Sequence, residues 1–175
     1  TFDNHFEDHV RGVRNKLQFY RKYQDVTQND SQHLVGAYRV CFRNVNDIHT
    51  FRQSILRNSM ILDGIAILFT KNPLEAQTGN DWEQLNGSLS PEDLQLLNEC
   101  SGADPDGVEK ALIKWVTNGV LPINPNARKI DLEVSVWTDG FNERDERTAL
   151  LQLAESMEPD WIVSIDADEL FEDRI

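Results

Sequence analysis

The sequence predicts an α/β protein built on a mostly parallel β-sheet. Two short apolar segments, residues 34–42 and 65–69, are rich in strand-forming residues and flank a segment with helical spacing of its apolar residues. Two further predicted strands, residues 130–137 and 161–165, flank a second such helix. Strands that alternate with helices form βαβ units, whose strands lie parallel in one sheet. With 39% hydrophobic and 27% charged residues, the 175-residue chain has the composition of a globular domain with one core.

An amphipathic helix is predicted before the first strand, over residues 4–23. Residues 25–32 are polar and are predicted to form a linker. We therefore expect a helical extension and linker over residues 1–33, followed by an α/β domain over residues 34–175 that is incomplete. The apolar residues of the first helix recur every three or four positions, which places on one face Phe6, Val10, Val13, Leu17 and Tyr20.

The helix between the first two strands is predicted over residues 47–59, with Ile48, Phe51 and Ile55 on its inner face. After the second strand, the segment 74–126 is predicted to be an acidic helical insertion that serves as a lid or packing element.

Within that insertion, Ser90 followed by Pro91 is a typical helix start. A second helix is predicted over residues 106–117, with Asn118 and Gly119 as its stop and an extended loop over residues 121–126.

The last part of the domain returns to alternating strands and helices. Residues 130–137 alternate apolar and polar, which predicts a strand with one polar face near the edge of the sheet. The next helix is predicted over residues 143–157, where Pro159 follows its end. The strand at 161–165 then runs directly into Asp166.

The charge distribution narrows the possible ligands. The formal net charge is −13, which excludes a broad basic surface for nucleic acid. The longest nearly apolar run, residues 60–69, is half of the roughly 20 residues needed to cross a bilayer, so we expect no membrane span in this segment. As a separate expectation, we place the chain in the cytoplasm. Residues 131–175 contain 14 acidic and only 3 basic residues, so carboxylates are concentrated at this end.

Three carboxylates follow the last predicted strand, at Asp166, Asp168 and Glu169. Ligands of open α/β sheets bind beyond the carboxyl ends of the strands. In an extended chain Asp166 and Asp168 point to the same side. Such a pair can bind Mg²⁺ or Mn²⁺, which in turn neutralises a diphosphate.

Other interpretations of this acidic turn remain open. It can simply end a strand and cap the next helix. An EF-hand is disfavoured because Phe171 occupies the position of the turn-forming glycine. A phosphatase of the haloacid dehalogenase type also has a strand ending in D-x-D, but Leu170 stands where threonine or valine is expected.

Two segments resemble family-two glycosyltransferases, which have a GT-A fold. Residues 141–151 read FNERDERTALL, and residues 160–169 read DWIVSIDADE. In that family an arginine-containing helix precedes a strand that reads roughly D-W-hydrophobic-D-A-D-E. The resemblance implies a Rossmann-like three-layer sandwich with a helical insertion. It also implies the nucleotide-sugar-binding portion of an inverting, metal-dependent glycosyltransferase.

The resemblance implies specific roles for several residues. Asp168 matches the metal ligand, Asp166 a contact to the ribose or the metal, and Glu169 a supporting carboxylate. The metal is Mn²⁺ or Mg²⁺, and the partners are a nucleotide-sugar donor and an acceptor hydroxyl on a glycan, lipid or protein. The catalytic base is expected beyond residue 175. The family's helix arginine and its first nucleotide-facing loop correspond to Arg147 and to Arg43 and Asn44.

One departure from the family keeps other functions open. After the second strand the family places an aspartate near the nucleotide, whereas this chain has Phe69, Thr70, Lys71 and Asn72. Lys71 can contact phosphate instead. The alternatives are a catalytically silent interaction module and, less favoured, a metal-dependent phosphoesterase.

Overall fold

The computed structural model describes residues 32–42, 45–70, 90–101, 104–123, 129–140 and 142–171. All the helices and strands below belong to the unit that spans residues 33–175. The predicted helix at residues 4–23 lies outside the described residues, as do three residues considered for phosphate or nucleotide contacts, namely Arg43, Asn44 and Lys71.

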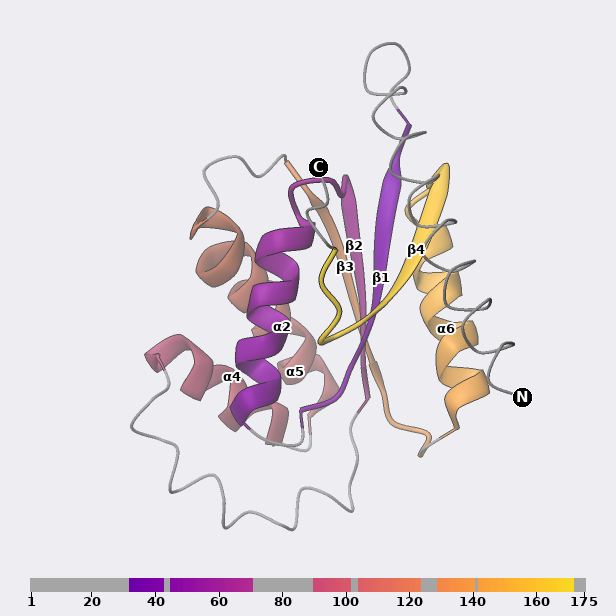
Figure 1. Ribbon diagram of the computed structural model, residues 1–175. Helices are drawn as coiled ribbons and strands as arrows, with labels where there is room; N and C mark the ends of the chain where they lie inside the picture. Colours follow the sequence, from indigo (N-terminus) through magenta and orange to yellow (C-terminus); the bar gives the residue numbers. More distant parts are fainter. Residues whose placement is uncertain are drawn as a thin grey trace, which may run out of the picture. The chain divides into compact units, whose positions relative to one another are not determined.

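A four-stranded, entirely parallel sheet forms the centre of the domain (Figure 1). The strands lie in the order β3-β2-β1-β4. This order confirms the predicted α/β class, and it matches the first four strands of a Rossmann-type sheet. The strands are β1 (Leu34–Val40), β2 (Gly64–Thr70), β3 (Asp131–Trp137) and β4 (Trp161–Asp166).

The apolar pattern of each strand explains its place in the sheet. Every residue of β2 is buried, and β1 is buried except at Arg39, because both central strands have a helix layer on each face. β3 alternates between exposed and less exposed residues along its first half and lies at the edge, as predicted.

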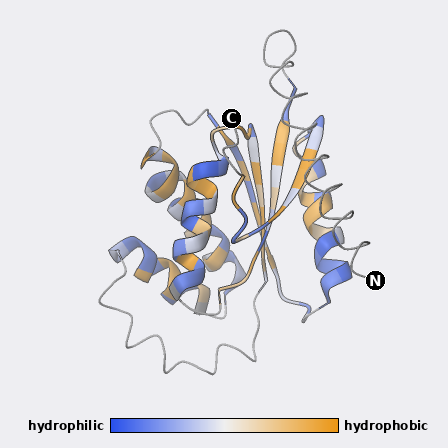
Figure 2. Ribbon diagram, viewed as in Figure 1, coloured by the Kyte–Doolittle hydropathy of each residue, from blue (hydrophilic) through white to orange (hydrophobic). Residues whose placement is uncertain are grey.

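Helices cover both faces of the sheet (Figure 1). Helices α2 (Val45–Asn58), α4 (Pro91–Ser101) and α5 (Pro105–Lys114) lie on one face, and α6 (Glu143–Glu155) lies on the other. Figure 2 shows apolar residues concentrated in the strands and on the sides of the helices that face them. The fold is therefore a three-layer α/β sandwich. Helix α5 packs against β3, so this part of segment 74–126 is a packing element.

Side chains alternate between the two helix layers. On the α6 face, Val35 and Ala37 of β1 pack with Ala66, Leu150 and Ala154. On the opposite face the ring of Tyr38 meets Phe51 of α2, with ring centres 5.7 Å apart. Odd-numbered residues of β1 therefore face α6, and even-numbered residues face α2.

The predicted end of the second helix in the insertion was wrong. Helix α5 continues into a π-helix, η3 (Trp115–Val120), and then into a 3-10 turn, η4 (Leu121–Ile123). Gly119 does not adopt a positive φ and so does not end the helix; its carbonyl accepts a hydrogen bond from Arg52 Nη1 at 2.7 Å. Burial of Val116 and Val120 adds tertiary packing that overrides the local stop signal. The predicted extended loop at 121–126 is likewise wrong at 121–123, and its remaining residues lie outside the described chain.

Candidate functional site

The sheet has a topological switch point between β1 and β4. The chain passes from β1 through β2 to β3 on one side, and β4 returns to the other side of β1. In open α/β sheets the crevice at the carboxyl ends of such strands is the usual ligand position. Arg39 and Asp166 are register partners at this end of β1 and β4. The strand order therefore places the predicted acidic residues at the switch point.

The backbone turns sharply after Asp166. Asp166 is the last residue of β4, and residues 167–168 form a turn closed by a hydrogen bond from Glu169 N to Asp166 O at 2.9 Å. The Glu169 side chain folds back, and its Oε2 accepts from Asp166 N at 3.0 Å. The prediction that Asp166 and Asp168 point to the same side of an extended chain is therefore wrong, because Asp168 lies in a turn.

The acidic turn contains carboxylate oxygens suitable for binding a hard cation, but three of its carboxylates do not converge on one position. Asp166, Asp168 and Glu169 are all exposed and offer carboxylate oxygens, which Mg²⁺ and Mn²⁺ prefer. One Glu169 oxygen is engaged by the Asp166 amide. Within the described ranges, no group of three or more histidine, cysteine, aspartate or glutamate side chains is arranged to hold a metal ion. The chemistry of these residues fits a divalent cation, and binding would require the turn to adjust.

Arg147, the arginine singled out in the sequence, pairs within its own helix. Its Nε and Nη2 donate to Glu143 Oε1 at 3.0 and 2.9 Å, one turn earlier in α6. Both side chains are about half exposed, so this i,i+4 pair contributes little to stability. Among the described residues Arg147 pairs with Glu143 and not with the acidic turn, so its contact with a ligand stays a prediction.

Arg39 is the arginine that reaches the strand-end acids, and the sequence prediction missed it. Its Nη2 lies 4.0 Å from Asp166 Oδ1, while its Nη1 lies 3.7 Å from both Glu143 Oε1 and Glu146 Oε2. The available signal was a single charged residue inside the otherwise apolar segment 34–42. Such a residue needs a partner when a strand is covered on both faces.

A buried polar network on α2 holds the far end of the acidic turn. Ser54 Oγ and Asn58 Nδ2 donate to the Glu169 carbonyl at 2.6 and 3.1 Å. Asn58 Oδ1 accepts from Phe171 N at 3.0 Å, and Asn58 Nδ2 also donates to the Tyr38 hydroxyl at 2.9 Å. Because Tyr38, Ser54 and Asn58 are fully buried, the network fixes the path of the chain after β4.

The Tyr38 hydroxyl titrates far above its ordinary range. Burial raises the pKa of Tyr38 to about 12, although side-chain hydrogen bonds with Asn58 and Ser54 oppose the rise. The raised pKa means that its stabilising contribution is complete below the ordinary value of 10.0 and is lost as the pH rises toward 12.

We expect the phenolate absorbance of the chain to show a late step near pH 12 that belongs to Tyr38. Subtracting the titration of Tyr38→Phe from that of the unmodified chain isolates this step from the two other tyrosines. A difference curve centred near 10 would show that Tyr38 is not buried in this network.

A second polar cluster joins α2, α4 and η3. Asp93 Oδ1 accepts from Arg52 Nη2 and from Trp115 Nε1, the latter at 2.7 Å. The Arg52 guanidinium also lies over the Trp115 ring, 4.9 Å from its centre. Asp93 N donates to Ser90 Oγ at 3.1 Å, so the predicted N-cap is confirmed. The cluster connects three elements of the helical layer that are far apart in the sequence.

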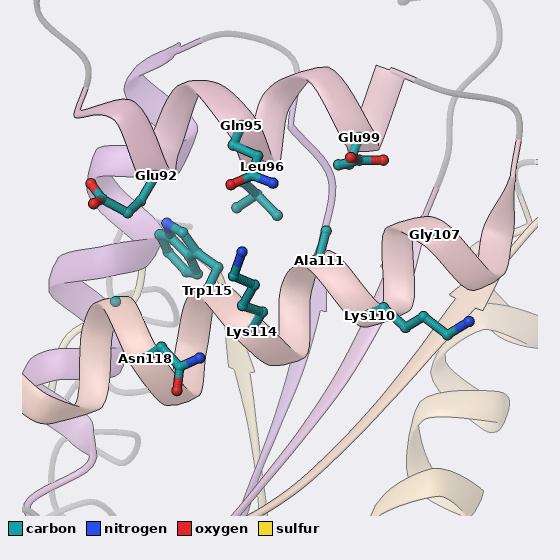
Figure 3. A pocket seen from close by; sticks show the side chains of 11 residues that line it. Glu92, Gln95, Leu96, Glu99, Gly107, Lys110, Ala111, Lys114, Trp115 and Asn118 are labelled. Carbon is teal, nitrogen blue, oxygen red and sulfur yellow. The ribbon is translucent and has the colours of Figure 1, made fainter.

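A groove of about 580 Å³ lies between α4 and α5 (Figure 3). Leu96, Ala111 and Trp115 form its apolar floor, while Glu92 and Glu99 line the α4 side. Lys114 extends into the groove from α5, as Figure 3 shows. No residue of the acidic turn lines this groove.

The fold and the carboxyl edge of its sheet define a parallel three-layer α/β domain with an acidic turn at its switch point. Comparison with protein families, curated proteins and solved structures gave no match to this chain. Among the described residues, none of the helices is both long and apolar enough to cross a membrane.

Proposed function

We propose that this chain supplies the donor-binding half of a metal-dependent glycosyltransferase, which transfers a sugar from a nucleoside-diphosphate sugar to an acceptor hydroxyl. In this proposal Asp168 and Asp166 bind Mn²⁺ or Mg²⁺, with Glu169 as a supporting carboxylate, and the cation neutralises the diphosphate. Arg43, Asn44 and Arg147 contact the donor.

One observation carries the proposal. The residues D-A-D-E begin at the carboxyl end of β4, beside β1, where the strand order reverses. This is the position at which open α/β sheets bind nucleotides. Because the site is rich in carboxylates, a phosphorylated ligand needs a cation between itself and the protein.

A catalytically silent interaction module is the second candidate. It is favoured by the pairing of Arg147 with Glu143 and by the lack of a preassembled three-carboxylate cation site in the part of the chain described above. A silent module would keep the α/β core and lose affinity for nucleotides.

Calorimetry with Mn²⁺ and a panel of nucleotide sugars tests the proposal. We expect binding that requires Mn²⁺ and that weakens at least about tenfold in Asp168→Ala, because a directly coordinating carboxylate is lost. Glu155→Ala is the matched control, since it removes an exposed carboxylate at the C-terminal end of α6, the end opposite to Glu143. Binding without any Mn²⁺ requirement, or equal binding by Asp168→Ala, would contradict the proposal.

A further inference from the structure

The guanidinium of Arg39 lies among three carboxylates at the carboxyl end of β1. Glu143, Glu146 and Asp166 approach it at 3.7, 3.7 and 4.0 Å. Two of these acids come from α6 and one from β4, so Arg39 balances acids from both neighbouring elements. Asp166 is the only one of the three that also belongs to the acidic turn.

Arg39 forms an ion pair with a buried acid, Glu146. The Glu146 side chain is 1% exposed, and its Oε1 has no hydrogen-bond partner among the residues that the structure describes. A buried carboxylate without its counter-charge is costly, so Glu146 holds Arg39 in place. The Asp166 side chain is 51% exposed and that of Arg39 is 26% exposed, so Asp166 is the more accessible of the two to an ion from solvent.

We infer that Arg39 is an internal counter-cation that competes with a divalent cation for Asp166. This inference rests on the proposed function, because it concerns the cation that the acidic turn would bind. Asp166 forms an ion pair with Arg39 on the α6 face of the sheet. The carboxylates of the turn do not converge to form a three-ligand cation site. A cation that binds Asp166 must draw it away from Arg39 and must tolerate the nearby positive charge.

The sign of the effect distinguishes this role from a purely structural one. A divalent ion about 6 Å from Arg39 is repelled enough, even at the dielectric constant of water, to weaken its binding about tenfold. Removing the charge should therefore strengthen cation binding. A residue that merely held Asp166 in a productive position would have the opposite effect when removed.

The test titrates Mn²⁺ alone into matched variants. Arg39→Met by itself leaves Glu146 buried without a counter-charge and risks unfolding, so the comparison is made between Glu146→Gln and the double variant Arg39→Met/Glu146→Gln. We expect the double variant to bind Mn²⁺ about tenfold more tightly than Glu146→Gln. Arg39→Lys keeps the charge and should bind as weakly as the unmodified chain. Equal or weaker binding by the double variant would overturn the inference while leaving the cation site intact.

A metal-free measurement separates this inference from the proposed function. The Hα–Hβ couplings of Asp166, measured by NMR without metal, should indicate one dominant rotamer in Glu146→Gln and averaging among rotamers in the double variant. Identical couplings in the two variants would show that Arg39 does not hold Asp166, whether or not the chain binds Mn²⁺. If the couplings differ but no variant binds Mn²⁺, then the cation site of the proposed function is wrong. The inferred competition between Arg39 and a cation is then wrong as well.

Discussion

Replacing Asp93 by alanine is expected to lower the free energy of unfolding by about 3–5 kcal/mol, because it removes one partner of a buried ion pair. Asp93 and Arg52 have side-chain exposures of 3% and 15%. Without Asp93, the Arg52 guanidinium would stay partly buried, and its partners among the described residues would be the Gly119 carbonyl and the Trp115 ring. The Trp115 Nε1–H would also lose its acceptor. The helical layer formed by α2, α4 and η3 should therefore loosen together.

Urea unfolding at neutral pH measures this loss. Glu92→Ala is the matched control, because Glu92 precedes Asp93 in the same first turn of α4 but is exposed. We expect the control to change stability by no more than about 0.5 kcal/mol. Similar values for the two variants would mean that the Asp93 cluster contributes no more than a surface charge at the start of the helix.

The same cluster should make stability depend on acid pH. Burial alone would raise the pKa of Asp93, but the hydrogen bonds from Arg52 and Trp115 and the charge of Arg52 hold it below its ordinary value of 3.8. The contribution is therefore complete above pH 3.8 and is lost as the pH falls through the lower value of the folded state. Asp93→Asn should show a smaller loss of stability than the unmodified chain over this acid range.

The fold could be predicted largely because its strands carry simple signals. The two central strands are continuous apolar runs, and β3 alternates, so both their existence and the edge position of β3 follow from the sequence. The π-helix after Lys114 could not be predicted in this way. Within it, the Gly119 carbonyl accepts a hydrogen bond from Arg52, which lies 67 residues away in the sequence. Local sequence signals such as Asn118 and Gly119 give no information about that long-range contact.

The position of the candidate site in the fold could be predicted from the sequence, but the arrangement of its side chains could not. A strand followed by Asp166, Asp168 and Glu169 was enough to predict an acidic carboxyl edge. The arrangement depends on Arg39 and Asn58, which contact the turn and its flanks from elsewhere in the chain. A polar Asn58 on the apolar stripe of a helix is the sort of signal that indicates a buried network.

Asn58→Ala is the variant expected to affect both stability and the acidic turn. The change removes hydrogen bonds to the Glu169 carbonyl, the Phe171 amide and the Tyr38 hydroxyl in one step. A net contribution of about 1 kcal/mol for each lost bond gives a decrease of about 3 kcal/mol in the free energy of unfolding. Tyr38→Phe removes only the hydroxyl from the same network, so it should cost about 1 kcal/mol.

Hydrogen exchange then separates local release of the turn from general destabilisation. In Asn58→Ala the amide of Phe171 should exchange faster, by a larger factor than amides in the centre of β2, because its acceptor is gone. Tyr38→Phe should leave Phe171 protected, since that hydrogen bond goes to Asn58 Oδ1 and not to the phenol. If Asn58 positions the turn for a ligand, Mn²⁺-dependent donor binding should weaken in Asn58→Ala even at a temperature where the variant is fully folded. Unchanged exchange at Phe171 would show that the turn keeps its course without α2, and the buried network would then act on stability alone.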